Sequence, residues 1–321
     1  MGVGEQSIPG QVLAIGEILV DFIVTDGATT LEAAEMFVAR SGGAPANASV
    51  ALTRLGLDSG FCGVVGDDQF GVRLRTELAA EGVDTSRVRQ SNEAATTLAF
   101  AWKDSDGDGH FWLLRGADAR LSEADANAAG VASLGALVVG SVALSAQPAR
   151  SAIERAVDLA GRAGVPVVFD VNLRPTLWSD LATARPACEE VAERSTLVKL
   201  SLDDAIGLYG PAVTPDAAIE AVLSLGAKAV VLTDGERGCW FSSGSPPTFV
   251  PAFRVEAVEP TGAGDAFTAA IVARELATRW APLTLDDVRY AAAAGALATT
   301  RPGAWDGLPN RAQLDAFLAR Q

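Results

Sequence analysis

Short β-branched apolar segments alternate with longer Ala- and Leu-rich segments along most of the chain. Continuous apolar runs of strand length predict strands buried on both faces, and apolar residues at helical spacing predict helices. The predicted strands cover residues 12–15, 59–65, 137–140, 165–170, 197–200, 229–233, 239–242 and 248–258. The predicted helices cover residues 45–55, 70–81, 148–163, 184–193, 215–225, 263–278, 285–299 and 311–319. This alternation predicts an α/β fold, with a mostly parallel sheet flanked by helices on both faces.

Two stretches interrupt the alternation, at about 17–40 and 94–118, where helix signals are weak. The second stretch predicts a β-hairpin, with strands over 96–102 and 110–114 joined by a turn at Asp104–Gly109. Strands outside the main sheet, close to the ends of core strands, indicate a small β-sheet lid over a binding site. No linker and no internal repeat divides the sequence, so we expect a single domain over all 321 residues.

The composition narrows the classes of function. The net charge of −15 argues against nucleic acid and anionic membranes as partners, because both attract basic surfaces. The single histidine, His110, excludes a two-histidine zinc site within one chain. The three cysteines are far apart and odd in number, which is typical of reduced thiols in a cytoplasmic protein. No Lys or Arg precedes Arg40, so we expect no secretory signal, and no apolar run is long enough to span a bilayer.

The stretch 261–265, Thr-Gly-Ala-Gly-Asp, joins the predicted strand 248–258 to the predicted helix 263–278. Small residues let backbone N–H groups at a helix N-terminus converge on an anion. A carboxylate beside such an anion site would repel a phosphate unless a hydroxyl lay between them. The arrangement suits phosphoryl transfer, with Asp265 accepting the proton of the attacking alcohol. We expect the helix N-terminus to lower the pKa of Asp265 below its ordinary value of about 4.

Polar or glycine-rich turns follow other predicted strands as well. Carboxylates and amides bind sugar hydroxyls, and Asp21 and Asn47 offer both beside the paired glycines Gly42 and Gly43, although each alone is equally well explained as a cap or turn residue. Other strand ends carry Asn172 and Arg174, Lys199 and Ser201, and Thr233, Gly235 and Gly238. Ligands bind at the carboxyl ends of strands in open α/β sheets, so we expect one crevice here. Arg174 is expected to stabilise the charge of a transferring phosphate.

These motifs resemble the two signatures of the PfkB-type, or ribokinase-like, sugar kinases. Gly42, Gly43, Asn47, Gly56 and Gly66 match the first signature, and Gly262–Asp265 match the second. The resemblance runs from about Val12 to Leu318. Within the family, the segments 16–22, 42–47 and 170–178 are most similar to fructokinases. The resemblance implies a ribokinase-like fold and transfer of the γ-phosphate of ATP to a primary hydroxyl of fructose.

The resemblance also implies roles for single residues. Asp265 resembles the catalytic base of the family, and Gly262, Ala263 and Gly264 resemble its anion hole. Asp21, Gly43 and Asn47 match its sugar-binding positions, and we expect Gly42 and Asn172 to contact the sugar with them. Thr233, Gly235, Gly238, Ala294, Ala298 and Gly303 match its nucleotide positions, to which we add Lys199 and Ser201. ATP and Mg²⁺ are implied as cofactors, and a homodimer paired through the lid strands is implied by analogy.

Two positions depart from the family pattern. Glu259-Pro260 stands where the family has Asp-Thr, whose carboxylate helps to hold a monovalent cation. Glu259 is therefore the candidate cation ligand, and K⁺ dependence is left open because its side chain is longer and Pro260 has no N–H. Asp204 stands where many members have a Glu that orders Mg²⁺ through water, so its shorter side chain is expected to shift or weaken that contact.

Other functions stay open at this point. A related kinase could use 2-keto-3-deoxygluconate, whose carboxylate Arg174 would grip, or ribose or a nucleoside. A catalytically silent sugar- or nucleotide-binding protein is the candidate of a different class. A dinucleotide-dependent dehydrogenase is disfavoured, because Phe267 stands at the third glycine position of the fingerprint that begins at Gly262.

Overall fold

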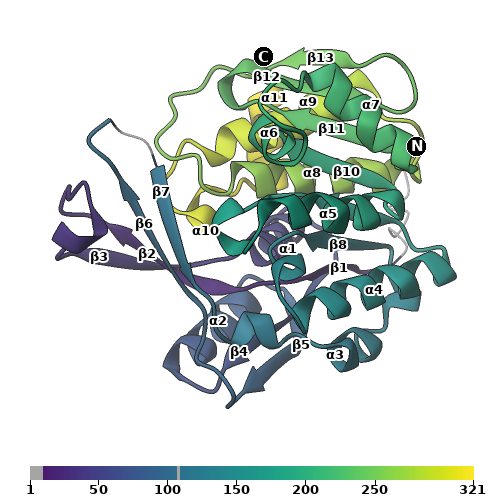
Figure 1. Ribbon diagram of the computed structural model, residues 1–321. Coiled ribbons are helices and arrows are strands. Elements are labelled where there is room, and N and C mark those ends of the chain that lie inside the picture. Colours follow the sequence, from purple (N-terminus) through teal and green to yellow (C-terminus); the bar gives the residue numbers. More distant parts are fainter. Residues whose placement is uncertain (1–9, 107–108) are drawn as a thin grey trace.

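A computed structural model describes residues 10–106 and 109–321 (Figure 1). Its centre is a nine-stranded sheet in the order β13-β12-β11-β10-β9-β8-β1-β4-β5. The strands are β1 (Val12–Ile15), β4 (Ser59–Gly66), β5 (Asp84–Ser91), β8 (Ala136–Gly140), β9 (Val167–Asp170), β10 (Leu197–Ser201), β11 (Ala229–Thr233), β12 (Gly238–Ser242) and β13 (Thr248–Pro251). Neighbours pair in parallel except at β12, which is antiparallel to both β11 and β13. The predicted mostly parallel sheet is confirmed.

Helices cover both faces of this sheet (Figure 1). They are α1 (Ala44–Arg54), α2 (Gln69–Ala80), α3 (Glu123–Ala128), α4 (Ala149–Ala163), α5 (Ala184–Glu193), α6 (Leu202–Tyr209), α7 (Pro215–Leu225), α8 (Ala263–Thr278), α9 (Leu285–Ala298), α10 (Ala304–Gly307) and α11 (Arg311–Leu318). Because strand side chains alternate, Val12 and Ala14 of β1 pack against α1, α8 and α9 in one core, whereas Leu13 and Ile15 pack against α4 and α5 in the other. β1 therefore holds two helical layers together.

A second, four-stranded sheet projects beside the main one, in the order β3-β2-β6-β7 (Figure 1). Its strands are β2 (Leu19–Val24), β3 (Phe37–Gly42), β6 (Leu98–Lys103) and β7 (Gly109–Leu114). They occupy the two stretches that lacked helix signals, although β3 continues beyond the first of them. The predicted turn between β6 and β7 falls partly outside the described residues, as do residues 1–9 of the predicted domain.

The predicted strand over 248–258 is too long. β13 ends at Pro251, which lies opposite Gly238, the first residue of β12. Beyond this point no strand of the described residues is available to accept the ladder hydrogen bonds. Phe253 and Val255 mimic strand alternation, but they pack against the core as part of an irregular connection to α8. The chain therefore reaches α8 through a loop and not directly from a strand.

β5 and α6 are among the elements that the sequence did not predict. β5 is a polar strand at the edge of the main sheet, and only its pairing with β4 identifies it. α6 is short and begins with a capping box between Ser201 and Asp204. Cys62, Cys188 and Cys239 are free and buried, as expected of structural thiols. Of the helices that the structure describes, none has both the length and the apolar character needed to cross a bilayer.

Candidate active site

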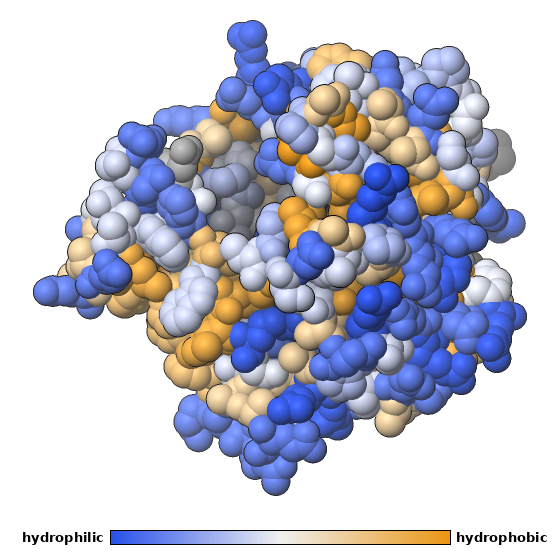
Figure 2. All heavy atoms as spheres, viewed as in Figure 1, coloured by the Kyte–Doolittle hydropathy of each residue, from blue (hydrophilic) through white to orange (hydrophobic). Residues whose placement is uncertain are grey.

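A cavity of about 350 Å³ lies between the small sheet and the carboxyl edge of the main sheet. The surface is hollowed between the small sheet and the main body (Figure 2). Of the residues predicted for the site, the cavity is lined by Asp21, Gly43, Asn47, Asn172, Arg174, Lys199, Glu259, Gly262, Gly264 and Asp265. The structure thus brings the predicted sugar side and the predicted catalytic turn to one place.

The first turn of α8 forms one end of the cavity. Gly262 has a φ of 84°, and a Cβ there would lie 2.9 Å from the carbonyl oxygen of Ala304, so only glycine fits this turn. Among the described residues, the N–H groups of Gly262, Gly264 and Asp265 have no hydrogen-bond acceptor. Orphan N–H groups of this kind suit an anion.

The predicted anion hole needs one correction. The N–H of Ala263 donates to the carbonyl oxygen of Pro260 at 3.1 Å, which closes the turn before α8. That donor is therefore engaged inside the protein. The free donors are those of the flanking glycines and of Asp265 itself.

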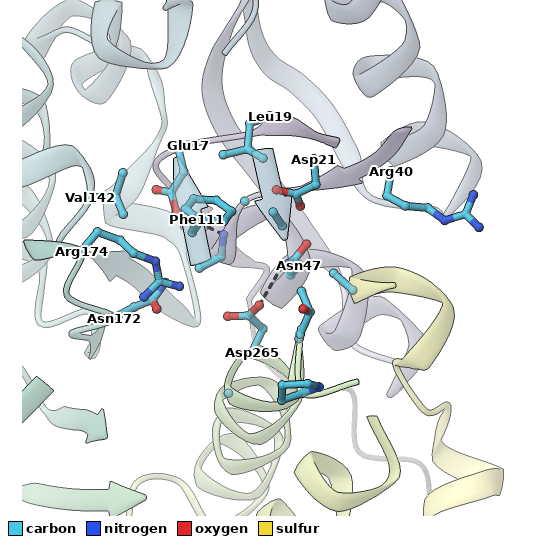
Figure 3. A pocket seen from close by; sticks show the side chains of 18 of the residues that line it. Glu17, Leu19, Asp21, Arg40, Asn47, Phe111, Val142, Asn172, Arg174 and Asp265 are labelled. Atoms are coloured by element: carbon cyan, nitrogen blue, oxygen red, sulfur yellow. Dashed lines mark hydrogen bonds between the residues drawn. The ribbon is translucent and has the colours of Figure 1, made fainter. Parts of the chain in front are cut away.

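Asp265 extends from this turn into the cavity, where its Oδ2 accepts a hydrogen bond of 2.7 Å from Asn47 Nδ2 (Figure 3). Burial raises the pKa of Asp265 to about 6, and the charge of Asp170 adds to the rise. The hydrogen bond from Asn47 and the charges of Lys199 and Arg174 oppose it. The predicted lowering of this pKa is wrong. The helix dipole stabilises the carboxylate by only about 0.3–1 kcal/mol, whereas burial destabilises it by more. The result is a stronger base than expected.

A buried ion pair lies beneath the catalytic turn. Lys199 Nζ lies 2.9 and 3.2 Å from the two carboxylate oxygens of Asp170, and Thr268 Oγ1 donates to Asp170 Oδ2 at 2.7 Å. Burial lowers the pKa of Lys199, but the nearby carboxylates outweigh it and raise that pKa overall. A Cβ on Gly264 would lie 2.9 Å from Lys199 Nζ, so the ammonium sits directly under α8. Lys199, predicted as a nucleotide contact, already has its partner in the protein.

The sugar side of the cavity is built on β2 and α1. A Cβ on Gly42 would overlap the carboxylate of Asp21, so glycine there makes room for this side chain. Gly43 caps α1 with a φ of 107°, and a Cβ there would lie 2.6 Å from the carbonyl oxygen of Glu17. Burial raises the pKa of Asp21 to about 7, with a further rise from Glu259.

Arg174 is the cation that faces these acids across the cavity (Figure 3). Its Nη1 donates to the carbonyl oxygen of Leu173 at 3.2 Å, and its guanidinium lies 6.0 Å from the ring centre of Phe111 in the small sheet. Within residues 10–106 and 109–321, no carboxylate lies within ion-pair distance of it. Asn172, two residues earlier, has a φ of 41°, which asparagine tolerates, and lines the same wall. This wall can therefore receive an anionic group.

Apart from Lys199, the predicted nucleotide positions lie outside the cavity. Ser201 and Thr233 are paired in register at the ends of β10 and β11, and Gly235 and Gly238 form the turn that follows. Gly303 begins α10. Ala294 and Ala298 are 1% and 0% exposed on α9, so their side chains pack the core. The predicted place of these two positions beside adenine stays a prediction.

The two candidate metal ligands are both hydrogen-bonded to the backbone. Asp204 accepts 2.7 Å hydrogen bonds from the N–H groups of Leu173 and Ser201, which use both of its oxygens. It is 6% exposed and caps α6, which is a structural role, and its predicted contact with Mg²⁺ through water stays a prediction. Glu259 lines the cavity, and its Oε2 accepts from Gly303 N at 2.9 Å. Its predicted role as a cation ligand stays a prediction.

Glu17 and Trp305 are among the residues at or behind the site that were not predicted. Glu17 lines the cavity, and its Oε1 accepts from Ala44 N at 3.1 Å. Its position as an acidic residue within the apolar stretch 12–20 could have indicated a functional role. Trp305 Nε1 donates to Asn47 Oδ1 at 2.7 Å, and no sequence pattern connects residues that lie 258 positions apart.

The buried acids make stability depend on pH. Burial raises the pKa of Glu17 from 4.5 to about 8 and that of Asp21 from 3.8 to about 7. Between about pH 6 and 8 the folded chain holds protons that the unfolded chain has released, so the free energy of unfolding should fall by about 1–3 kcal/mol as pH rises. Urea denaturation across this range measures it, and Glu17→Gln should flatten the fall. A stability that stays level or increases over the range would contradict these shifts.

Comparison with known proteins places this chain in a family. Residues 10–311 match the pfkB family of carbohydrate kinases. Fructokinase-1 of Zea mays is 34% identical over 312 residues, which cover 94% of this chain and 96% of the relative. A fructokinase with bound ATP from Xylella fastidiosa has a TM-score of 0.87 and 28% identity, over 97% of this chain and 98% of the other.

A double mutant of the fructokinase from Vibrio cholerae O395, with fructose, ADP and potassium ion bound, has a TM-score of 0.84 and 30% identity. The match covers 96% of this chain and 98% of the other. These similarities confirm both the ribokinase-like fold and the resemblance found in the sequence. The chain belongs to the pfkB family of carbohydrate kinases.

Proposed function

We propose that this protein is an ATP-dependent fructose kinase that transfers the γ-phosphate to a primary hydroxyl of the sugar. The observation that carries the proposal is the junction at α8, where the carboxylate of Asp265 stands beside free backbone N–H groups in the same cavity as Asp21 and Asn47. Fructokinases among its relatives support fructose as the acceptor.

Each group at this junction has a separate task. Asp21 and Asn47 bind hydroxyls of the sugar and point one primary hydroxyl at Asp265. Asp265 takes the proton as the oxygen attacks the γ-phosphorus and the bond to the ADP oxygen breaks. The N–H groups of Gly262 and Gly264, together with Arg174, stabilise the charge on the moving phosphoryl group. With a pKa of about 6, Asp265 is ionised at neutral pH and is poised to accept the proton.

ATP enters from the side of the turn after β11, where Thr233, Gly235 and Gly238 follow the carboxyl edge of the sheet. No cluster of His, Cys, Asp or Glu that could hold a metal ion occurs in the described part of the chain. Mg²⁺ bound to the phosphates of ATP would neutralise part of their charge. The residues of this chain align the two substrates around it.

The small sheet covers the sugar side of the cavity, and we propose that it acts as a lid on one kinase domain. Phe111 and Leu113 of β7 line the cavity, so the outer face carries Phe37, Trp112 and Leu114, which are 36%, 49% and 50% exposed. This apolar outer face supports the predicted homodimer, paired through the small sheets.

A kinase of 2-keto-3-deoxygluconate is the second candidate. Arg174 favours it, because a guanidinium without an ion-pair partner among the described residues can grip the carboxylate of a keto acid. The cavity would then hold an acidic substrate against the same wall.

An acceptor series separates these functions. ADP release is measured with fructose, glucose, ribose and 2-keto-3-deoxygluconate at equal ATP·Mg²⁺. We expect kcat/KM to be at least about tenfold higher for fructose than for the other acceptors, a difference of about 1.4 kcal/mol in transition-state binding. A higher kcat/KM for the keto acid would establish the second candidate. ADP release that no acceptor increases would overturn both and indicate a silent binding protein.

A further inference from the structure

Three side chains form a hydrogen-bonded line that ends at the proposed catalytic base. Trp305 Nε1 donates to Asn47 Oδ1 at 2.7 Å, and Asn47 Nδ2 donates to Asp265 Oδ2 at 2.7 Å. The two bonds use opposite ends of the asparagine amide. Their direction is therefore set by which end of the amide faces the indole.

The indole settles that direction, because its N–H is a donor and cannot accept. Only the carbonyl oxygen of Asn47 can face Trp305, so the NH₂ group must face Asp265. Without the indole the amide is free to rotate by half a turn. It could then turn its oxygen toward Asp265 and accept from the protonated carboxyl, an orientation that favours the acid over the carboxylate.

Trp305 is itself held firmly in place. It is 8% exposed and lies in α10, whose backbone is tied to α1 by Arg54. Arg54 Nη1 donates to the carbonyl oxygens of Trp305 and Leu308, the latter at 3.0 Å. The same guanidinium pairs with Glu81 at 2.7 Å. An anchored donor of this kind can impose an orientation on a neighbouring amide.

We propose that Trp305 is a positioning residue for phosphoryl transfer, because its indole N–H holds the Asn47 amide in the orientation that donates to Asp265. The consequence for catalysis rests on the proposed function, whereas the consequence for the amide rests on the geometry alone. Asn47 also binds the sugar in that proposal, so one orientation serves both the substrate and the base.

Other charges around Asp265 are expected to stay in place when Trp305 is changed. They are Asp170 and Lys199 beneath α8, Arg174 on the opposite wall and Asp21 on β2. None of them has a hydrogen bond to Trp305 in the described residues. A change in the titration of Asp265 in a Trp305 variant therefore reports the amide.

The first test needs no activity. The side-chain amide resonances of Asn47, assigned by their loss in Asn47→Ala, are followed by ¹⁵N NMR against pH in the wild type, Trp305→Phe and Trp240→Phe. Trp240 of β12 packs against Phe249 of β13, away from the cavity, and is the matched control. We expect the midpoint to lie at about 6 in the wild type and the control, and to rise by about half a unit to one unit in Trp305→Phe. A midpoint that does not move in Trp305→Phe overturns the proposal.

The second test uses the reaction. In Trp305→Phe, kcat/KM for fructose at about pH 6 should fall about three- to tenfold, with the acid limb moved upward by the same half to one unit. In an Asn47→Ala background the same substitution should change kcat/KM less than about twofold, because the residue through which it acts is gone. If the two substitutions lower kcat/KM independently, so that their fold-losses multiply in the double variant, the proposal is overturned. If the wild type does not phosphorylate fructose, the proposed function fails while the NMR titration still decides the role of Trp305.

Discussion

Asp265→Asn should lower kcat with fructose by about 10²–10⁴-fold while leaving the affinity for fructose within about threefold. The new side chain has the same shape, and its amide oxygen can still accept the hydrogen bond that Asn47 donates to Asp265 Oδ2 in the structure. What it loses is the ability to take a proton. Steady-state ADP release and a fructose-binding titration measure the two quantities on the same protein.

A matched control comes from Asp315, an exposed acid on α11 that does not line the cavity. Asp315→Asn makes the same chemical change and should leave kcat within about twofold, as surface substitutions do. If Asp265→Asn kept more than half of the wild-type turnover, another group would have to accept the proton and the assignment of the base would be wrong.

Lys199→Met should destabilise the fold by about 3–5 kcal/mol, because it leaves the carboxylate of Asp170 buried without its counter-charge. The side chains of this pair are 7% and 8% exposed, so water cannot replace the ammonium. Urea denaturation measures the loss. A second effect should follow at the site, since Lys199 opposes the raised pKa of Asp265 and its removal should raise that pKa further.

Two further variants separate the buried charge from simple loss of packing. Adding Asp170→Asn to Lys199→Met should recover a large part of the lost stability, because the uncompensated charge is removed. Arg162→Met removes a comparable chain from an exposed pair with Asp158, at 2.9 Å, and should cost at most about 0.5 kcal/mol. A loss below about 1 kcal/mol in Lys199→Met would mean that the pair contributes little to the folded state.

The catalytic turn could be predicted because its requirements are local. Gly262 must adopt a positive φ close to a neighbouring carbonyl, and a helix must start directly after it. Both requirements can be recognised from the residue types in a few consecutive positions. The same holds for Gly43 and for the strands buried on both faces. The prediction failed where the length of an element depends on a neighbouring strand. The strand that begins at Thr248 ends at Pro251, because its partner strand starts opposite that residue.

The pKa of Asp265 was predicted wrongly from the local sequence. The helix N-terminus predicted a low pKa for Asp265, but burial and the charge of Asp170 raise it. The ammonium of Lys199 is held by that same Asp170, and both oxygens of Asp204 are held by backbone N–H groups. Ser201 is close to Asp204 in the sequence, but Leu173 and Asp170 come from distant parts of the chain. The state of these side chains therefore depends partly on contacts that sequence spacing does not record.

The most direct test of the account is a single turnover with ATP labelled in its γ-phosphate. With fructose present, the label should appear in a fructose phosphate esterified at a primary hydroxyl, in step with ADP and without labelled protein. The same experiment with Asp265→Asn should give the same product far more slowly. Label released as inorganic phosphate at a rate that fructose does not change, or label bound to the protein, would contradict direct transfer at the α8 turn.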